Sequence, residues 1–366
     1  TVKRTHILSL SLCFTHTHTH THTMSSSKTD TGKWGSKWLW TAAVATGAAC
    51  VGGVVWWLWK KGTAGTSKTQ ENWGPGDVVG AVESLHVYPI KACAGISLQS
   101  SLLSQTGLMY DRRFMIVNAH TKDFVTQREF PALALVQTSF QRNMTELWAC
   151  APGMPDLLVS CLSNYPLDPP GAEKYAVRVW KDMCDAVDLG DVVAEWFSTF
   201  LKSPVRVVRM SVQHQRKLAQ KYVNMVQNKS APMQASFADG FPFLLASKAS
   251  IDAMGGDIRR FRPNIVVSGC SEFAEDDWKS LRIGDSILHN LKPCGRCVVT
   301  TVDPDRGVFS EDGQPLKTLK TTRNHQAVGP AFGVNLVHEK AGPMLRVGMD
   351  VALLAKAEEP LSKSFK

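Results

Sequence analysis

Short apolar runs separated by polar turns follow one another along most of the chain from Val78 onward. Runs of this length, rich in Val and Ile and bounded by Gly, Pro, Asp or Asn, are typical of β-strands. The pattern predicts strands within residues 204–210, 262–269, 286–290, 296–302 and 345–354. It also predicts a hairpin over residues 112–127, because two apolar runs there flank the polar segment 118–123.

Two segments carry a helical pattern instead. In residues 192–202 the apolar side chains recur at three- and four-residue spacing and form one stripe, and Asp191 is placed to cap the helix. Lys202 and Pro204 suit its end. A second helix is predicted from Ser247 to Gly255. Many short strands with a few helices, and no internal repeat, predict a β-rich α+β fold of the barrel type.

The segment before the folded part has a different pattern. Residues 38–59 carry no charge, and as a helix they would extend about 33 Å, enough to cross a bilayer. Tryptophans stand near both ends of this run, as in interfacial belts, and Lys60 and Lys61 end it. We therefore predict a single transmembrane anchor, whose orientation the flanking charges leave open. A cleaved signal peptide is the less favoured alternative.

The remaining N-terminal segments are predicted to lie outside the folded domains. Residues 1–23 contain alternating Thr and His and are followed by Met24. We interpret them as upstream sequence read in frame, since a dinucleotide repeat yields this alternation. With the residues up to 37 they form a predicted disordered N-terminus, 1–37, and the Gly-, Ser- and Thr-rich segment 60–77 is predicted to be a linker.

Composition narrows the possible functions. The chain has 366 residues, 44% of them hydrophobic, so it can bury a substantial core. Its formal charge of +9 favours acidic partners or anionic ligands, but no dense Lys/Arg block with interleaved aromatics occurs, so nucleic-acid binding is not expected. The nine cysteines are odd in number and scattered, which indicates a reducing compartment.

One cysteine pair is closely spaced, Cys294 and Cys297 in "LKPCGRCVVTTVDPDRG". A structural zinc site needs four ligands, and no second Cys or His pair stands at a suitable spacing. A redox dithiol favours a helix start, whereas the β-branched run after Cys297 predicts a strand. Two buried thiols are the plain alternative. Because Lys292 and Arg296 flank the pair, we favour a single thiolate that binds a metal cofactor with its own phosphate.

The same segment carries a family resemblance. "PCGRCVVTTVDPDRG", with "RPNIVVSG" upstream and "VYPIKACAG" near the start, resembles the MOSC proteins, which bind molybdenum cofactor. The apolar anchor with "FLKS", "AEDDW" and "IGDSIL" is similar to one branch of that family, the mitochondrial amidoxime-reducing components. The resemblance implies an N-terminal MOSC-associated β-barrel-like domain over residues 78–210, a MOSC β-barrel domain over 211–356 and a tail over 357–366.

The resemblance also implies site residues. Cys297 matches the molybdenum ligand of the family, which makes it a metal-binding and catalytic residue, whereas Cys294 is expected to be structural. Lys91, Arg112 and Arg262 match cofactor-binding positions, with Arg113 a competitor of Arg112. Further cofactor contacts are expected from Ala92, Gly240, Asn264, Gly295 and Arg296, and Arg128 matches an arginine of less certain role.

Asp239 is the second catalytic residue that the resemblance implies. It matches an acidic residue near the metal that can relay protons, although a turn aspartate before Gly240 explains it equally well. Vertebrate members have Thr-Ser after this aspartate, where this chain has Gly240 and Phe241. Backbone N–H groups are therefore expected to replace hydroxyl contacts to the cofactor phosphate.

The activity implied by the resemblance is a molybdenum-cofactor-dependent reduction of amidoximes, hydroxamic acids and N-hydroxyamines. Electrons would come from NADH through cytochrome b5 reductase and cytochrome b5, at the mitochondrial outer membrane and facing the cytosol. The chain has no Gly-x-Gly-x-x-Gly after a strand, so a dinucleotide site of its own is not expected. Two alternatives stay open: a membrane-tethered molybdenum-cofactor carrier without reductase activity, and a zinc-stabilised β protein.

Overall fold

The computed structural model describes residues 73–162, 168, 173–228 and 230–358. The predicted N-terminus 1–37 and anchor 38–59 lie outside the described residues, as do most of the linker 60–77 and of the tail 357–366. Among the residues that are described, no helix is both long enough and apolar enough to cross a membrane. All of them belong to one compact unit.

Seven strands close into a barrel. In order around the ring they are β12 (Phe243–Ser247), β13 (Ile265–Ser268), β1 (Val78–Val87), β21 (Asp350–Lys356), β14 (Trp278–Ile283), β15 (Ser286–Gly295) and β19 (Gly329–His338). The ring closes because β12 pairs with β19 on one side and with β13 on the other. Alternate side chains fill the interior with one hydrophobic core, which includes Leu85, Leu281 and Val334. The MOSC-type β-barrel that the sequence predicts is therefore present.

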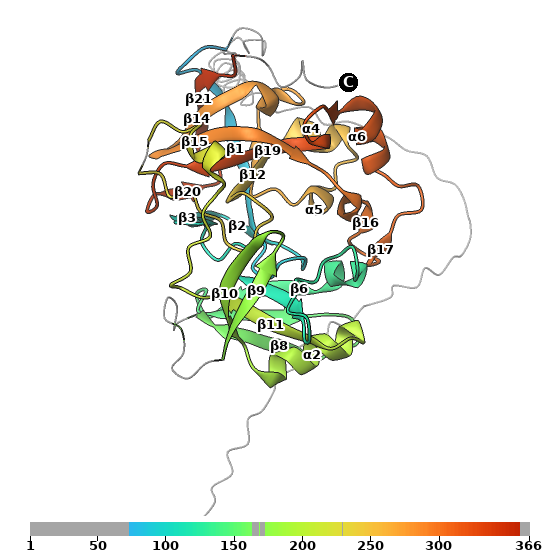
Figure 1. Ribbon diagram of the computed structural model, residues 1–366. Helices are drawn as coiled ribbons and strands as arrows, with labels where there is room; N and C mark the ends of the chain where they lie inside the picture. Colours follow the sequence, from blue (N-terminus) through green and yellow to red (C-terminus); the bar gives the residue numbers. More distant parts are fainter. Residues whose placement is uncertain (1–72, 163–167, 169–172, 229, 359–366) are drawn as a thin grey trace, which may run out of the picture. The chain divides into compact units, whose positions relative to one another are not determined.

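β1 joins the beginning of the described chain to its end. It opens the predicted N-terminal domain 78–210, yet it pairs with β13 and β21, which both belong to the segment 211–356. Its side chains Val82, Leu85 and Val87 are buried in the barrel core. Figure 1 shows this blue strand among the orange and red strands of the barrel. The two predicted domains therefore share a strand.

A second core lies in the segment between β1 and the rest of the barrel. This segment forms two sheets. One is four-stranded, in the order β5 (Phe114–Asn118), β11 (Val205–Met210), β10 (Asp182–Asp188), β9 (Lys174–Val179). The other is three-stranded and consists of β6 (Gln137–Gln141), β7 (Glu146–Cys150) and β8 (Leu157–Cys161). Helix α2 (Asp191–Leu201) covers β8 and β11 (Figure 1). Its Trp196 and Phe197 are buried among residues of both sheets, as the apolar stripe predicts.

Shorter elements connect these layers. They are β2 (Ile96–Leu98), β3 (Ser100–Ser104), β4 (Gly107–Leu108), η2 (Pro131–Leu135), α3 (Gln220–Val223), α4 (Lys248–Ala253), α5 (Ile258–Phe261), η4 (Ala274–Asp277), η5 (Val298–Thr301), β16 (Val302–Asp303), β17 (Val308–Phe309), α6 (Leu316–Thr322), β18 (Asn324–His325) and β20 (Met344–Arg346). β2 pairs with β1, and β18 pairs with β19, so both extend the barrel sheet.

Most of the predicted elements are confirmed. Residues 204–210, 262–269 and 286–290 contain β11, β13 and β15, and the two predicted helices are α2 and α4. The capping role predicted for Asp191 is wrong: Gly190 is the N-cap of α2, and Asp191 lies in the first turn and pairs with Arg206 across 2.7 Å. Residues 345–354 fall in two strands, β20 and β21. In the predicted hairpin the second arm is reduced to a single bridge between Val117 and Phe124.

The strand predicted over residues 296–302 is wrong. Val298–Thr301 form the 3₁₀ turn η5, and only Val302 continues into a strand. The carbonyl of Cys297 accepts hydrogen bonds from the N–H (3.1 Å) and the hydroxyl (2.9 Å) of Thr300, and the Thr301 hydroxyl donates to the Val298 carbonyl (2.8 Å). These local bonds override the β propensity of the run. Cys297 therefore stands at the start of a helical turn, which weakens the argument against a redox dithiol.

A β-bulge in β19 lies beside the cysteine pair. Between the pairs Pro293–Val334 and Gly295–Ala331, β15 has one residue and β19 has two. One of the two is Gly333, whose φ is +70° and whose Cβ would lie 2.7 Å from the Leu245 carbonyl oxygen in β12. Both the left-handed backbone and this close approach require glycine.

We expect Gly333→Ala to destabilise the protein by about 2–4 kcal/mol, because it combines a strained φ with a clash against the β12 backbone. Gly348→Ala is the matched control: its φ is +84°, but no atom lies within 4 Å of the added Cβ, so a loss of about 1 kcal/mol is expected. Equilibrium urea unfolding measures both. Equal losses would contradict the importance of the close approach.

Candidate active site

A cavity of about 180 Å³ lies where loops from the two halves of the described chain meet. Residues 91–92, 112 and 126–128 contribute from the first half, and residues around 238–244, 261–264 and 294–300 contribute from the second. Five cationic residues line it: Lys91, Arg112, Arg128, Arg262 and Arg296. Asp239 is the one lining carboxylate in the described part of the chain. Such an excess of positive charge favours an anionic ligand.

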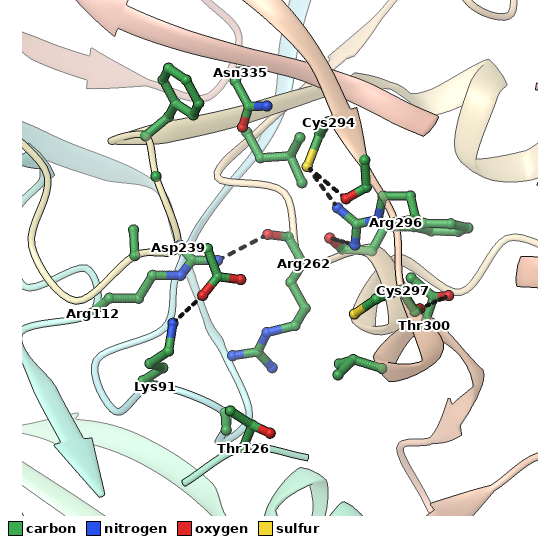
Figure 2. Close-up of a pocket in the computed structure, with 18 of the residues that line it drawn as sticks. Lys91, Arg112, Thr126, Asp239, Arg262, Cys294, Arg296, Cys297, Thr300 and Asn335 are labelled. Carbon is green, nitrogen blue, oxygen red and sulfur yellow. Dashed lines mark hydrogen bonds and ion pairs between the residues drawn. The ribbon is translucent and has the colours of Figure 1, made fainter. Parts of the chain in front are cut away.

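Lys91 and Asp239 form an ion pair in this cavity (Figure 2). The ammonium of Lys91 donates to Asp239 Oδ1 at 2.5 Å and to the Phe237 carbonyl at 2.9 Å. Burial lowers the pKa of Lys91, against the opposing effect of Asp239. Burial would raise the pKa of Asp239, but the charge and hydrogen bond of Lys91 hold that pKa well below its usual range. The Asp239 side chain is 66% exposed, so solvent weakens the pair.

Arg112 and Arg262 both stack on the ring of Tyr88. Their guanidinium carbons lie 4.6 and 4.2 Å from the ring centroid. Arg112 has a carboxylate partner, since it donates to Asp111 Oδ2 at 2.5 Å. Arg262 has none among the described residues, and burial lowers its pKa to about 10. It still carries its charge at neutral pH. Arg262 is therefore a buried cation that an anionic ligand would stabilise.

Three lining residues other than glycine have a left-handed backbone. The φ angles are 75° for Ala92, 47° for Arg112 and 59° for Arg262, which also caps the C-terminal end of α5. Positive φ is unfavourable for residues with a Cβ and persists where surrounding contacts enforce it. The Ala92 carbonyl, for example, accepts a hydrogen bond of 2.5 Å from the Gln127 amide. Strained positions of this kind gather at functional sites.

The two cysteines have different surroundings. Cys297 Sγ accepts a hydrogen bond of 3.2 Å from the exposed Arg128, whereas Cys294 Sγ accepts one of 3.3 Å from Arg296. Arg296 also donates to the Phe261 carbonyl at 2.7 Å, which ties Cys294 into the barrel loops. A Cβ on the intervening Gly295 would lie 2.8 Å from the Val328 carbonyl oxygen, so this loop requires glycine. Both thiols are half-buried, and they differ in the arginine that donates to them.

The structure brings all the predicted site residues to one cavity. Its lining includes Lys91, Ala92, Arg112, Asp239, Gly240, Arg262, Asn264, Gly295, Arg296 and Cys297, together with Arg128 and Cys294. Arg113 is not part of the lining and donates to the Met210 carbonyl instead, so Arg112 is the cavity arginine. The amide of Asn264 bonds to Arg112, to the Leu244 N–H and to the His86 carbonyl. Asn264 therefore supports Arg112 and has little capacity left for a ligand.

Arg216 is a site residue that sequence patterns do not reveal. It is buried, and its guanidinium donates to the carbonyls of Ser236, Ala238 and Asp239 and to the carboxylate of Asp182. It thereby fixes the loop that carries Asp239 and joins this loop to the β9–β10 hairpin. In the sequence it stands among polar residues, "QHQRKLAQ", and resembles a surface charge. Only the tertiary structure distinguishes Arg216 from a surface arginine.

Comparison with known families agrees with this architecture. Residues 79–204 match the MOSC N-terminal beta barrel domain, and residues 232–352 match the MOSC domain. The two matches cover most of the described chain and define a MOSC-domain protein.

Similarity to curated relatives narrows the class of MOSC-domain proteins further. Mitochondrial amidoxime-reducing component 1 of Mus musculus is 32% identical over 340 residues, which cover 88% of this chain and 93% of the relative. The Homo sapiens protein of the same name is 32% identical over 339 residues, 87% of this chain and 94% of the relative. Mitochondrial amidoxime reducing component 2 of Bos taurus is 34% identical over 289 residues, 74% of this chain and 82% of the relative. The chain belongs to the family of the mitochondrial amidoxime-reducing components.

We expect Arg216→Met to lower the free energy of unfolding by about 2–4 kcal/mol, because it leaves several carbonyl groups without their buried donor. Arg142→Met is the matched control. Arg142 pairs with Glu146 at 3.2 Å, but its side chain is 79% exposed, so its loss should cost less than about 0.5 kcal/mol. Urea unfolding at neutral pH compares the two. A loss in Arg216→Met as small as in the control would show that the loop does not need this clamp.

The Asp239 ion pair predicts a specific pH dependence. The folded pKa of Asp239 is depressed, so its stabilisation is present above the ordinary value of 3.8 and is lost as the pH falls through the lower folded value. The stability difference between wild type and Asp239→Asn should therefore be complete near pH 7 and shrink below about pH 4. Urea unfolding across this range measures it. Asp156→Asn, at an exposed aspartate with no ion pair among the described residues, is the control and should show no such trend.

Proposed function

We propose that this protein is a molybdenum-cofactor-dependent reductase of N-hydroxylated compounds, which converts amidoximes, hydroxamic acids and N-hydroxyamines to amidines, amides and amines. The observation that carries the proposal is the cavity in which five cationic residues surround the thiol of Cys297. The names of the relatives, amidoxime-reducing components, supply the reaction class.

The side chains of the cavity fit this cofactor, a pterin that carries a phosphate and binds molybdenum through sulfur. Cys297 would be the protein's soft ligand to the metal. Lys91, Arg112 and Arg262 would bind the phosphate and the polar edge of the pterin, and Arg262 has no competing carboxylate in the described chain. Arg296 also lines the cavity, and its terminal nitrogens donate to Cys294 Sγ and to the Phe261 carbonyl, so it would hold the loop that carries Cys297 beside the cofactor.

Backbone groups would complete the binding site. The N–H groups of Ala92, Gly240 and Gly295 lie on segments that line the cavity. A Cβ added to Gly240 would meet nothing within 4 Å, so the space beside this backbone is open. This openness supports backbone contacts to the cofactor at Gly240, where the sequence offers no hydroxyl side chain.

Bound cofactor supplies the two-electron chemistry that cleavage of an N–O bond requires. The chain itself must orient the substrate and provide protons. Lys91 donates to Asp239 at 2.5 Å and holds the pKa of this carboxyl group well below its usual range, so Asp239 is ionised near neutral pH. We therefore assign proton delivery to the Lys91–Asp239 pair, with Asp239 holding the ammonium in place rather than acting as an acid by itself.

The electron supply and the location follow from family membership and are part of the proposal. NADH, cytochrome b5 reductase and cytochrome b5 would provide the electrons, and the net positive charge of the chain is compatible with an acidic cytochrome. The word "mitochondrial" in the names of the relatives supports a mitochondrial location, and the apolar run 38–59 supports a membrane anchor. The outer membrane, with the folded part in the cytosol, is what the family resemblance implies. A tethered cofactor carrier would use the same cavity, and only activity distinguishes it.

Two cysteine variants test the assignment. We expect Cys297→Ser to lose molybdenum and to lower benzamidoxime reduction at least 100-fold, because an alcohol is a poor ligand for a soft metal. Cys294→Ser should keep most of both, since the other ligands of the site are intact. Elemental analysis of the purified proteins and turnover with the reconstituted NADH, reductase and cytochrome b5 chain are the measurements.

The possible outcomes separate the alternatives. Stoichiometric molybdenum without any reduction in the wild type would favour the carrier. Stoichiometric zinc without molybdenum would rule out the proposed enzyme. Equal losses of metal in the two variants would indicate a site that uses both sulfurs.

A further inference from the structure

We propose that Trp180 determines substrate specificity, with its indole acting as a stacking surface for the aromatic group of aryl-substituted N-hydroxylated substrates. The identity of the reacting group, an N-hydroxylated nitrogen, rests on the proposed function. The stacking surface rests on the position and contacts of Trp180.

Trp180 occupies a strained position that its burial does not explain. It lies with Lys181 in the two-residue turn of the β9–β10 hairpin, since Val179 pairs with Asp182. Its φ is 56°, a conformation suited to glycine or asparagine and costly for a bulky side chain. Its side chain remains 47% exposed, so core packing does not compensate the strain. An exposed aromatic residue kept in an unfavourable backbone conformation points to a role at this place.

The contacts of Trp180 hold the indole against the cavity. Its ring N–H donates to Asp239 Oδ1 at 3.2 Å, and its edge packs on Phe124 with centroids 5.2 Å apart. The guanidinium of Arg128 lies 5.0 Å from the ring centroid and also donates to Cys297 Sγ at 3.2 Å. The indole is thus fixed from three sides, and one side chain separates it from the proposed metal ligand.

A substrate would have to approach beside this indole. With the cofactor held by the residues that line the cavity, a substrate would enter past the exposed side chains of Arg128, Trp180 and Asp239. Asp239 Oδ2 accepts no hydrogen bond from the described residues and can therefore accept one from the amino group of an amidoxime. An aromatic plane next to a free carboxylate oxygen fits a flat aryl group that carries N–H donors.

Substrate pairs and three variants test the proposal. Wild type, Trp180→Ala, Trp180→Phe and Met183→Ala are compared for kcat and KM with benzamidoxime and acetamidoxime. In Trp180→Ala the ratio of kcat/KM between the aryl and the alkyl substrate should fall by about five- to tenfold, through a higher KM for benzamidoxime. Trp180→Phe should keep most of the ratio. Met183, 53% exposed on the same hairpin, is the control and should leave the ratio at the wild-type value.

A binding measurement separates this inference from the proposed function. Calorimetric titration of the cofactor-loaded protein with benzamidine and acetamidine needs no turnover. Weaker benzamidine binding in Trp180→Ala, about fivefold or more, supports the stacking surface even where the wild type reduces neither amidoxime. Unchanged benzamidine binding, or equal losses of kcat/KM for the two amidoximes, would overturn it.

Discussion

Mutual repulsion among the cationic side chains around one cavity is the constraint on which the surrounding structure depends. Two of the five charges have a carboxylate partner, Asp239 for Lys91 and Asp111 for Arg112, and the Tyr88 ring contacts both Arg112 and Arg262. Arg128, Arg262 and Arg296 have no carboxylate partner in the described chain, so the compensation is incomplete by three charges. The proposed phosphate-bearing cofactor would supply negative charge to this site and would thereby stabilise the folded protein.

This charge compensation requires loops that are far apart in the sequence to keep fixed positions relative to one another. The carbonyl of Asp111 accepts a hydrogen bond of 2.7 Å from Ser236, and the carbonyl of Arg112 accepts one of 3.0 Å from the Phe237 N–H. Arg216 holds the other side of the same 236–239 loop. These bonds connect the loop before β5 to the loop before β12. The position of Asp239 is therefore set by backbone hydrogen bonds as much as by its own ion pair.

Local sequence patterns were sufficient for much of the fold, and motif resemblance selected residues that the structure brings to one cavity. The strands β11, β13 and β15 have clear apolar runs, and α2 has a clear stripe, because each packs one face on a core. Cys297, Lys91, Arg112 and Arg262 were found through motif resemblance. Sequence could not reveal the turn at 298–301, where threonine hydroxyls compete with strand formation. It also could not reveal Arg216 or Trp180, because their roles depend on carbonyls and carboxylates brought close only by tertiary structure.

The two predicted domains share β1, and this affects how the chain folds during its synthesis. During synthesis β1 emerges before any other described strand, whereas one of its neighbours, β21, is almost the last. The part of β1 that pairs with β21, residues 78–81, therefore keeps one open edge until nearly the whole chain has left the ribosome. By then β2 can already pair with residues 85–87 of β1, and the 114–210 segment can form its own sheets. Closure of the barrel is in effect a late, chain-length-dependent event. A truncated product that lacks β21 would expose open strand edges, which are prone to pair with other chains.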